Sequence, residues 1–247
     1  MSKQGGLGDN LYAAGYDLSG DVGSLSRIGG GPAPLDVTGI NKSAPERIGG
    51  VRDGAIEFLA FFNDAAGQEH PRLSLLPTAD QIVTYCRGTT LGNAAAALVA
   101  KQINYDGSRG TDGSLTFTMQ ALANGFGLEW GTQLTAGKRT DTTATNGTGV
   151  DGGAASAFGL QAYLHVFSFT GTSVTVKIQE SSDNGAGDAF ADVVGGGFTA
   201  ATGVTSERIA TSGALAVERY LRVVTTGTFS SAVFAVMVAR NATATVF

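Results

Sequence analysis

Apolar and polar residues alternate between Ser114 and Ala121, and this alternation predicts the central strand of the chain. A period of two places successive side chains on opposite faces of a strand, so one face is apolar and the other carries hydroxyl and amide groups. The flanking dipeptides Asp112-Gly113 and Asn124-Gly125 favour tight turns, which indicates an antiparallel sheet. Because the polar face has no charge, we expect it to line a passage or to contact a second copy of the chain. Its residues are Ser114, Thr116, Thr118 and Gln120.

The residues around this strand predict one helix and several more strands. Residues 1–50 are rich in glycine and short of apolar runs, so we expect an extended arm with one or two short strands. Residues 51–54 are predicted to form a turn, and residues 56–62 a strand that is covered on both sides because both of its faces are apolar. Residues 71–76 predict a short helix with proline in its first turn. Further strands are predicted at residues 81–87, 94–105 and 127–134, with Phe126 and Trp130 in the core.

A long segment without apolar periodicity divides the chain into two predicted domains. Residues 136–157 hold many Thr, Gly and Asn, and so long a loop is rare inside a compact domain. We therefore expect a first domain at residues 1–140, a linker at 141–157 and a second domain at 158–247. Short strand patterns joined by Gly, Asp and Asn turns predict an antiparallel, jelly-roll-like β-sandwich for the second domain, so the whole chain is predicted to be all-β with a minor helix. These strand patterns lie at residues 161–170, 173–180, 189–194, 207–210, 219–226 and 232–240.

The composition indicates a protein that assembles. Glycine supplies 37 of the 247 residues, about 15% against a usual value of about 7%. Charged residues make up only 15%, so we expect neighbouring copies to cover much of the surface. The net charge is -5 and no run of Lys or Arg occurs, which excludes tight nucleic-acid binding through a cationic cluster. No secretion signal or 18-residue apolar stretch is found, so we expect no membrane insertion, and the single Cys86 indicates synthesis in a reducing cytoplasm.

No set of residues in the sequence predicts an enzyme, a metal site or a cofactor. The two histidines, His70 and His165, lie far apart and are expected to be structural residues, and Cys86 is expected to be a small buried hydrophobe. Residues 183–188 supply several oxygens but lack the later glutamate of an EF-hand, so they predict a hairpin loop. Charged residues also cluster before the central strand, in a loop that either is solvated or contacts another subunit. They are Asp106, Arg109 and Asp112.

Three stretches resemble a known family when they are taken in order along the chain. They are GVRDGAIEFLAFFN at residues 50–63, LPTADQIVTYCRGTT at 76–90 and KQINYDGSRGTDGSLTFTMQALANGFGLEWG at 101–131. Together they resemble the major tail protein, or tail tube protein, of long-tailed, siphovirus-type bacteriophages, especially those of actinobacteria. The resemblance covers most of residues 1–140, and the second domain is similar to the extra C-terminal β domain that some of these proteins carry.

The resemblance implies a fold, a set of partners and a location. In that family the tube domain is a pair of packed β-sheets with a flanking helix, and six copies close into a ring whose inner strands form a continuous barrel. The rings stack around the tape measure protein, meet terminator and tip proteins at the tail ends, and let DNA pass during ejection. The implied location is the virion tail, assembled in the host cytoplasm, with the second domain on the outside of the tube. No catalytic residue and no cofactor belong to the family.

Two other functions stay open at this point. A capsid decoration protein would bind preformed heads and make no tube alone. A carbohydrate-binding or adhesion module is suggested by the jelly-roll-like second half. The uncharged strand fits the tube better than either alternative, because a wall without cations does not hold the phosphates of passing DNA.

Overall fold

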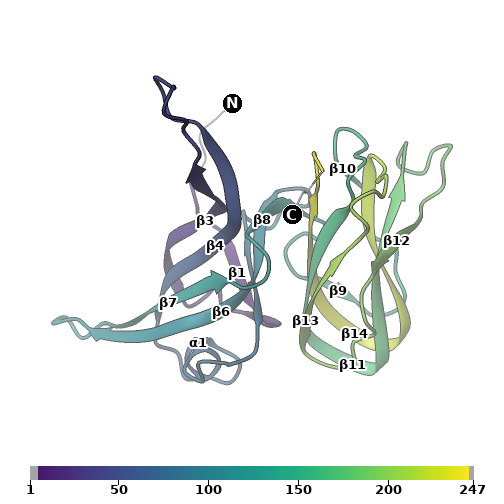
Figure 1. The fold of residues 1–247 in the computed structure, drawn as a ribbon. Helices are drawn as coiled ribbons and strands as arrows, with labels where there is room; N and C mark the ends of the chain where they lie inside the picture. Colours follow the sequence, from purple (N-terminus) through teal and green to yellow (C-terminus); the bar gives the residue numbers. More distant parts are fainter. Residues whose placement is uncertain (1–4, 245–247) are drawn as a thin grey trace. The chain divides into compact units, whose positions relative to one another are not determined.

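The computed structural model describes residues 5–244 and consists almost entirely of antiparallel strands (Figure 1). Strands take 57% of the residues and helix 2%, which confirms the predicted all-β fold with a minor helix. The chain forms two compact units. The hairpin unit holds residues 21–83 and 98–129, and the sandwich unit holds the described parts of residues 1–20, 84–97 and 130–247.

The hairpin unit is built on a four-stranded antiparallel sheet whose strands follow the order β3-β4-β7-β6. Two pairs of these strands form long hairpins, β3 with β4 and β6 with β7, which extend in different directions in Figure 1. A single short helix, α1, belongs to the same unit. The bounds are β3 Val22–Asp36, β4 Arg47–Phe61, β6 Ala94–Arg109, β7 Leu115–Ala123 and α1 Glu69–Leu73, and β5 Gln81–Cys86 runs from this unit into the sandwich unit.

One face of this sheet forms the core of the hairpin unit. Phe58 of β4 lies opposite Met119 of β7, and Ile56 lies opposite Ala121, all of them buried. Full burial of a side chain such as Phe or Ile contributes about 1.5–3 kcal/mol to folding. Helix α1 covers this face with Leu73, whose carbonyl accepts a hydrogen bond of 2.6 Å from the Gln102 amide. Of the apolar positions in the alternating stretch, Met119 and Ala121 are buried as predicted, whereas Leu115 near the hairpin tip is exposed.

The predicted turn at residues 51–54 is wrong, because β4 passes straight through these residues. Gly54 serves a close approach of two segments: a Cβ built on it would lie 2.6 Å from the backbone nitrogen of Leu128. Glycine inside a strand often marks such an approach rather than a reversal. Residues 1–50 do contain two short strands, β1 Asn10–Ala13 and β2 Tyr16–Asp17. The expectation of an arm nevertheless missed β3, which is 15 residues long and pairs with β4 from Val22 to Asp36.

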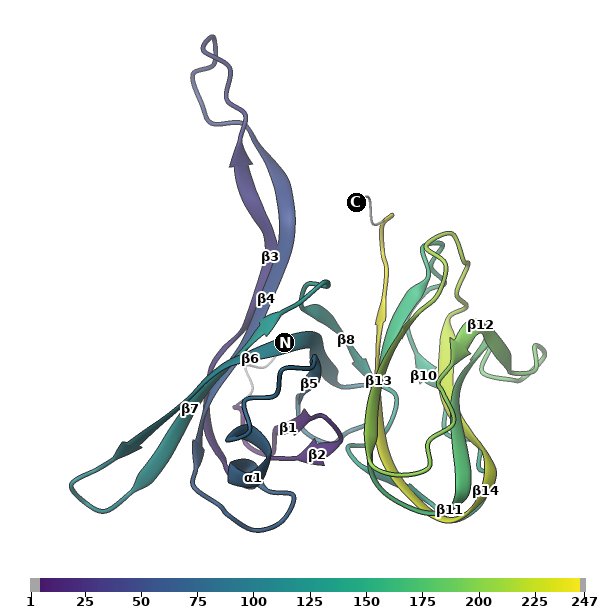
Figure 2. The same ribbon diagram turned by 60° about the horizontal axis from the view of Figure 1, so that its bottom comes forward.

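The sandwich unit is organised by two very long strands, β11 and β14, which pair antiparallel along their full lengths. Sequence patterns predicted two separate strands in each of them. In the structure each strand continues where the register between them shifts on either side of Gly171, and Figure 2 shows both strands curving together. The bounds are β11 Leu160–Ser181 and β14 Tyr220–Arg240.

The halves of β11 and β14 on either side of the curve contribute to one hydrophobic core. Alternate residues of both strands are buried there, as a period of two requires of a strand with one buried face. The shorter strands extend the pair on both sides, because β12 and β13 pair with β11, whereas β8, β9 and β10 pair with β14. The core residues of the two long strands are Leu160, Ala162, Leu164, Val166, Val174, Val176, Ile178, Leu221, Val223, Ala232, Phe234, Val236 and Val238. The other bounds are β1 Asn10–Ala13, β2 Tyr16–Asp17, β8 Glu129–Gln133, β9 Arg139–Asp141, β10 Val150–Asp151, β12 Ala191–Gly197 and β13 Thr205–Ala210.

The structure divides the chain at other places than the sequence analysis expected. The segment predicted as a linker contains β10 and the end of β9, and both strands pair with β14. The guanidinium of Arg139 binds the buried Asp141 carboxylate through two hydrogen bonds of 2.7 Å and also donates to the carbonyls of Thr145 and Val223. These contacts hold the polar segment against β14, which a search for apolar periodicity does not reveal.

Two predicted core aromatics are exposed, and the single cysteine is buried. Trp130 has 53% of its surface exposed and Phe126 has 42%, so the expectation that both lie in the core is wrong. Trp130 contacts Tyr85 edge-on within the sandwich unit. Cys86 is buried as expected, and burial raises the pKa of its thiol to about 12, so the thiol is protonated and unreactive at neutral pH.

His165 is a structural residue, as expected, and joins three parts of the sandwich unit. Its ring is buried in β11, where Nδ1 accepts a hydrogen bond of 3.1 Å from the Gly15 N–H and Nε2 lies 2.9 Å from the Thr84 hydroxyl. A neutral imidazole has one donor and one acceptor, so Nε2 carries the proton and donates it to Thr84. This arrangement fastens the β1–β2 turn and β5 to β11.

We expect acid to destabilise the sandwich unit through His165. Burial lowers the pKa of this imidazole from 6.5 to about 3. The unfolded chain therefore takes up a proton below about pH 6.5 that the folded chain does not accept until about pH 3, so the free energy of unfolding falls across this window, by up to about 1.4 kcal/mol per pH unit. Urea unfolding of the His165→Gln variant should show a weaker dependence on pH, and an unchanged dependence contradicts this assignment.

A second stability prediction concerns Gly131 in β8. A Cβ at this position would lie 2.6 Å from the carbonyl carbon of Val238 in β14. Because the neighbour is backbone, the two strands must separate to admit even a methyl group, and such overpacking costs about 1–3 kcal/mol. We expect the Gly131→Ala variant to unfold at a lower urea concentration than the unchanged protein. Gly213→Ala, where a Cβ meets nothing within 4 Å, is the matched control.

Candidate assembly surface

The polar side of the central strand forms part of an exposed face of the hairpin unit. Thr116, Thr118 and Gln120 lie in β7 as predicted, and none of the three is buried. Ser114 precedes the strand, in the turn that joins β6 to β7. The uncharged row is thus three residues of β7, with the fourth at the hairpin tip.

The neighbouring strands add charge to this face. Thr118 lies beside Asp106 of β6, and Gln120 lies beside Glu57 of β4. Arg27 of β3 is opposite Glu57 and forms an ion pair of 3.4 Å with it. The row in β7 is uncharged, but the strands on either side of it add the carboxylates of Glu57 and Asp106 and the guanidinium of Arg27 to this face. The complete hairpin unit has seven basic and eleven acidic residues, a net charge of -4.

The three charged residues that were predicted in a loop before the central strand lie in and beside β6. Asp106 and Arg109 belong to β6, opposite Thr118 and Leu115 of β7, so their assignment to a loop is corrected. The hairpin is longer than its glycines suggested, because Gly107 lies inside the strand opposite Phe117. Asp106 and Arg109 are both exposed near the end of the hairpin.

Asp112 does lie in the connecting turn and shapes it. Its carboxylate accepts hydrogen bonds from the backbone N–H of Ser114 at 3.0 Å and from the Ser114 hydroxyl at 2.7 Å. These bonds stabilise the ionised form and lower the pKa of Asp112. The loop thus has a local structural function, and Asp112 carries a negative charge at the exposed tip.

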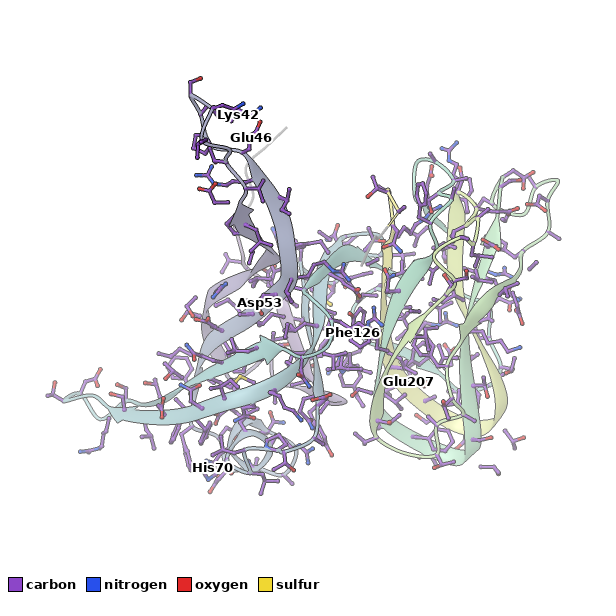
Figure 3. The ribbon with its side chains drawn as sticks, in the orientation of Figure 1. Lys42, Glu46, Asp53, His70, Phe126 and Glu207 are labelled. Carbon is purple, nitrogen blue, oxygen red and sulfur yellow. The ribbon has the colours of Figure 1, made fainter. Side chains whose placement is uncertain are left out.

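The second hairpin, β3–β4, is exposed over its outer half. Every residue from 30 to 49 is exposed, and Figure 3 labels Lys42 and Glu46, which form an ion pair of 2.9 Å at its tip. An isolated two-stranded ribbon is marginally stable in water. This ribbon also exposes several large apolar side chains to solvent. Exposed apolar side chains that cluster on one surface indicate an interaction site. The large apolar side chains that the ribbon exposes are Leu35, Val37, Ile40, Ile48 and Val51.

The sheet of the hairpin unit ends in two open strand edges. In the described part of the chain, β3 pairs with β4 alone. β6 pairs with β7 at residues 100–109 and with β5 and β8 near its start, so the outer half of β6 has an open edge. An open edge presents unpaired N–H and C=O groups that pair readily with another chain. Because the four strands alternate in direction, β3 and β6 run in opposite directions. The β6 edge of one copy can therefore pair antiparallel with the β3 edge of the next.

Ile103 lies on the open part of β6, and 53% of its surface is exposed. It lies at the register shift between Gln102 and Asn104, where the Asn104 side chain accepts a hydrogen bond of 2.9 Å from the Gln120 N–H. The sequence analysis did not select Ile103. Its only signal is an apolar residue between two amides, which the strand pattern alone does not distinguish from a core position.

The ionisable groups beneath the sheet have structural partners. The Tyr105 hydroxyl donates to the Glu69 carboxylate at 3.0 Å and lies 2.9 Å from His70 Nδ1, so His70 is a structural residue of α1 as expected. Burial raises the pKa of Glu69. Among residues 5–244, no group of three His, Cys, Asp or Glu side chains is placed to hold a metal ion, and no helix is long and apolar enough to cross a membrane.

Comparisons with known proteins give structural neighbours only. No protein-family model and no curated protein matches this sequence. The chain is similar to a protein in the virion of a native gene transfer agent particle, with 15% identity and a TM-score of 0.42, over 52% of this chain and 98% of that one. It is similar to a protein in the tail of an empty gene transfer agent particle. The identity is 18% and the TM-score 0.40, over 51% of this chain and 97% of that one. It is also similar to the SPP1 Dit protein (gp 19.1), which belongs to a hub adsorption apparatus in phages that infect Gram-positive bacteria. Here the identity is 14% and the TM-score 0.35, over 94% of this chain and 99% of that one.

Proposed function

We propose that this chain is a virion structural protein that forms a phage tail tube. Copies close into hexameric rings through the edges of the hairpin unit, and the rings stack to enclose a channel for DNA. The tape measure protein occupies the channel before ejection, and terminator and tip proteins contact the two ends of the tube. The C-terminal domain that the sequence predicts, residues 158–247, lies on the outside of the tube.

The observation that carries this proposal is the pair of open edges on a single antiparallel sheet. The edges differ from each other, so their contact is heterologous, and a heterologous contact forms a ring when the rotation between copies closes. Closure also removes the edges that otherwise cause aggregation. The composition agrees, because a chain with only 15% charged residues is suited to a surface that its neighbours cover.

The exposed face of the hairpin unit suits the inner wall of such a channel. The hydroxyl and amide groups of β7 remain hydrated, and the carboxylates of Glu57 and Asp106 repel phosphate. A wall that presented many cations would bind passing DNA, since each neutralised phosphate adds to a salt-dependent affinity. We propose that Thr116, Thr118 and Gln120 face the channel, and that Asp106, Arg109 and Asp112 contact a neighbouring copy from the β6–β7 hairpin.

Electron microscopy of the purified full chain tests the proposal. Negative staining at increasing protein concentration should show rings and then tubes with a central channel. A monomer at every concentration contradicts the proposal. Binding to preformed phage heads without rings or tubes would instead indicate a capsid decoration protein.

A further inference from the structure

The sandwich unit contains a small buried hollow that the proposed assembly does not use. It lies among side chains of β1, β5, β8, β11 and β14, and its volume is about 10 Å³. A hollow of about 10–15 Å³ has room for a single water molecule, provided that polar groups surround it. Its lining residues with oxygen- or nitrogen-bearing side chains are Tyr12, Thr84, Gln133, Thr135, Tyr163 and His165.

Gln133 contributes an acceptor that needs a donor. Its side chain is 1% exposed, and its amide nitrogen donates to the carbonyls of Arg87 at 3.3 Å and Gly88 at 3.1 Å. These bonds fix the orientation of the amide, so Oε1 points away from both carbonyls. No residue in the described part of the chain donates a hydrogen bond to this buried oxygen. A buried acceptor without a donor loses the hydrogen bond that it makes with solvent in the unfolded chain.

Thr84 contributes a donor that needs an acceptor. Because His165 Nδ1 accepts from Gly15, Nε2 holds the ring proton and donates it to the Thr84 hydroxyl. The hydroxyl oxygen is thus an acceptor in that bond, and its own proton remains to be donated. Among residues 5–244, no hydrogen bond uses this proton, and Thr84 is 2% exposed. The unused proton and the unused Gln133 oxygen belong to residues that line the same hollow.

We propose that this hollow is a binding site for one structural water molecule. The water accepts a hydrogen bond from the Thr84 hydroxyl and donates one to Gln133 Oε1, and thereby links β5 to β8. The proposal concerns the folded chain itself and does not depend on whether the protein forms a tube.

A crystal structure at a resolution that shows ordered water tests the site directly. The unchanged protein should show one solvent peak within about 2.7–3.2 Å of both Thr84 Oγ1 and Gln133 Oε1. The Gln133→Leu variant should lose this peak. A map of the unchanged protein without the peak overturns the proposal, as does a peak that persists unchanged in Gln133→Leu.

A double-mutant cycle in solution provides a second test. Thr84→Val and Gln133→Leu each remove one partner of the same water, so the shift of the urea midpoint in the double variant should be clearly smaller than the sum of the two single shifts. Thr84→Val combined with Thr118→Val, which alters an exposed hydroxyl of β7, is the matched control and should give additive shifts. Additive shifts in the first pair overturn the proposal.

Discussion

The Ile103→Lys variant should remain monomeric under conditions in which the unchanged protein forms rings. Ile103 lies on the open edge of β6, and ring closure by edge pairing brings it against β3 of the next copy. A lysine on an edge strand is a common means of preventing such pairing, because its ammonium loses water without gaining a partner. A cost of about 3 kcal/mol for burying one unpaired charge lowers an association constant roughly 150-fold. Size-exclusion chromatography with light scattering measures the change in mass.

The control for this experiment is Val194→Lys. Val194 is also an apolar residue on an outer strand, β12 of the sandwich unit, and 73% of its surface is exposed. The Val194→Lys variant makes the same chemical change outside the hairpin unit, so it should form rings as the unchanged protein does. Because Ile103 is already half exposed, we expect neither variant to change the urea midpoint substantially. Rings formed by Ile103→Lys at the same protein concentration as the unchanged protein would show that β6 does not close the ring.

The Thr118→Lys variant should convert a tube that does not hold DNA into one that retains it. Thr118 lies on the exposed face of β7 between Leu59 and Asp106, and the proposed ring repeats it in every copy. Each new lysine that contacts a phosphate releases counterions, which adds about 0.9 to the magnitude of the slope of log affinity against log salt for double-stranded DNA. Several lysines in each ring act together, so DNA retention should be strong at low salt and disappear as salt rises.

Retention is measured by passing assembled particles and labelled DNA fragments through a size-exclusion column at several salt concentrations. Thr226→Lys places the same substitution at an exposed position of β14 in the sandwich unit and should not cause retention. Equal retention by the two variants would mean that DNA binds the outside of the particle. Strong, salt-dependent retention by the unchanged protein would contradict the proposed channel wall.

The parts of the fold that depend on local pattern were predicted correctly from sequence. The alternation from Leu115 to Ala121 identified β7, in which Met119 and Ala121 are buried, because burial of one face imposes a period of two. The strand at residues 94–105 was predicted despite its alanines, and it is the first part of β6. The short helix was predicted two residues after the start of α1 and three beyond its end, and it was found because proline is favoured in a first turn.

The parts that depend on contacts between distant residues were not predicted. Gly54 was interpreted as a turn residue, although it permits the close approach of Leu128, and Gly171 was interpreted as a break, although β11 continues through it. Glycine serves turns, bulges and close approaches equally well, so its position alone does not distinguish them. Likewise, the ion pair between Arg139 and Asp141 orders a segment whose composition resembles a linker.

The candidate surface was predicted only in part. The polar row of β7 was found because its residues are consecutive in one strand. Glu57 and Asp106 were not assigned to the same face, because they reach it from neighbouring strands through a register that the sequence does not display. The exposed ribbon of β3 and β4 was expected to be an arm, since glycine, proline and scattered apolar residues give no periodicity.

Cryo-electron microscopy of particles assembled from the unchanged chain is the most direct test of the account. We expect a closed β-sheet that continues from β6 of one copy into β3 of the next, with Thr118 on the inside of the ring. A ring closed through the sandwich unit, with both edges of the hairpin unit left open, would contradict it.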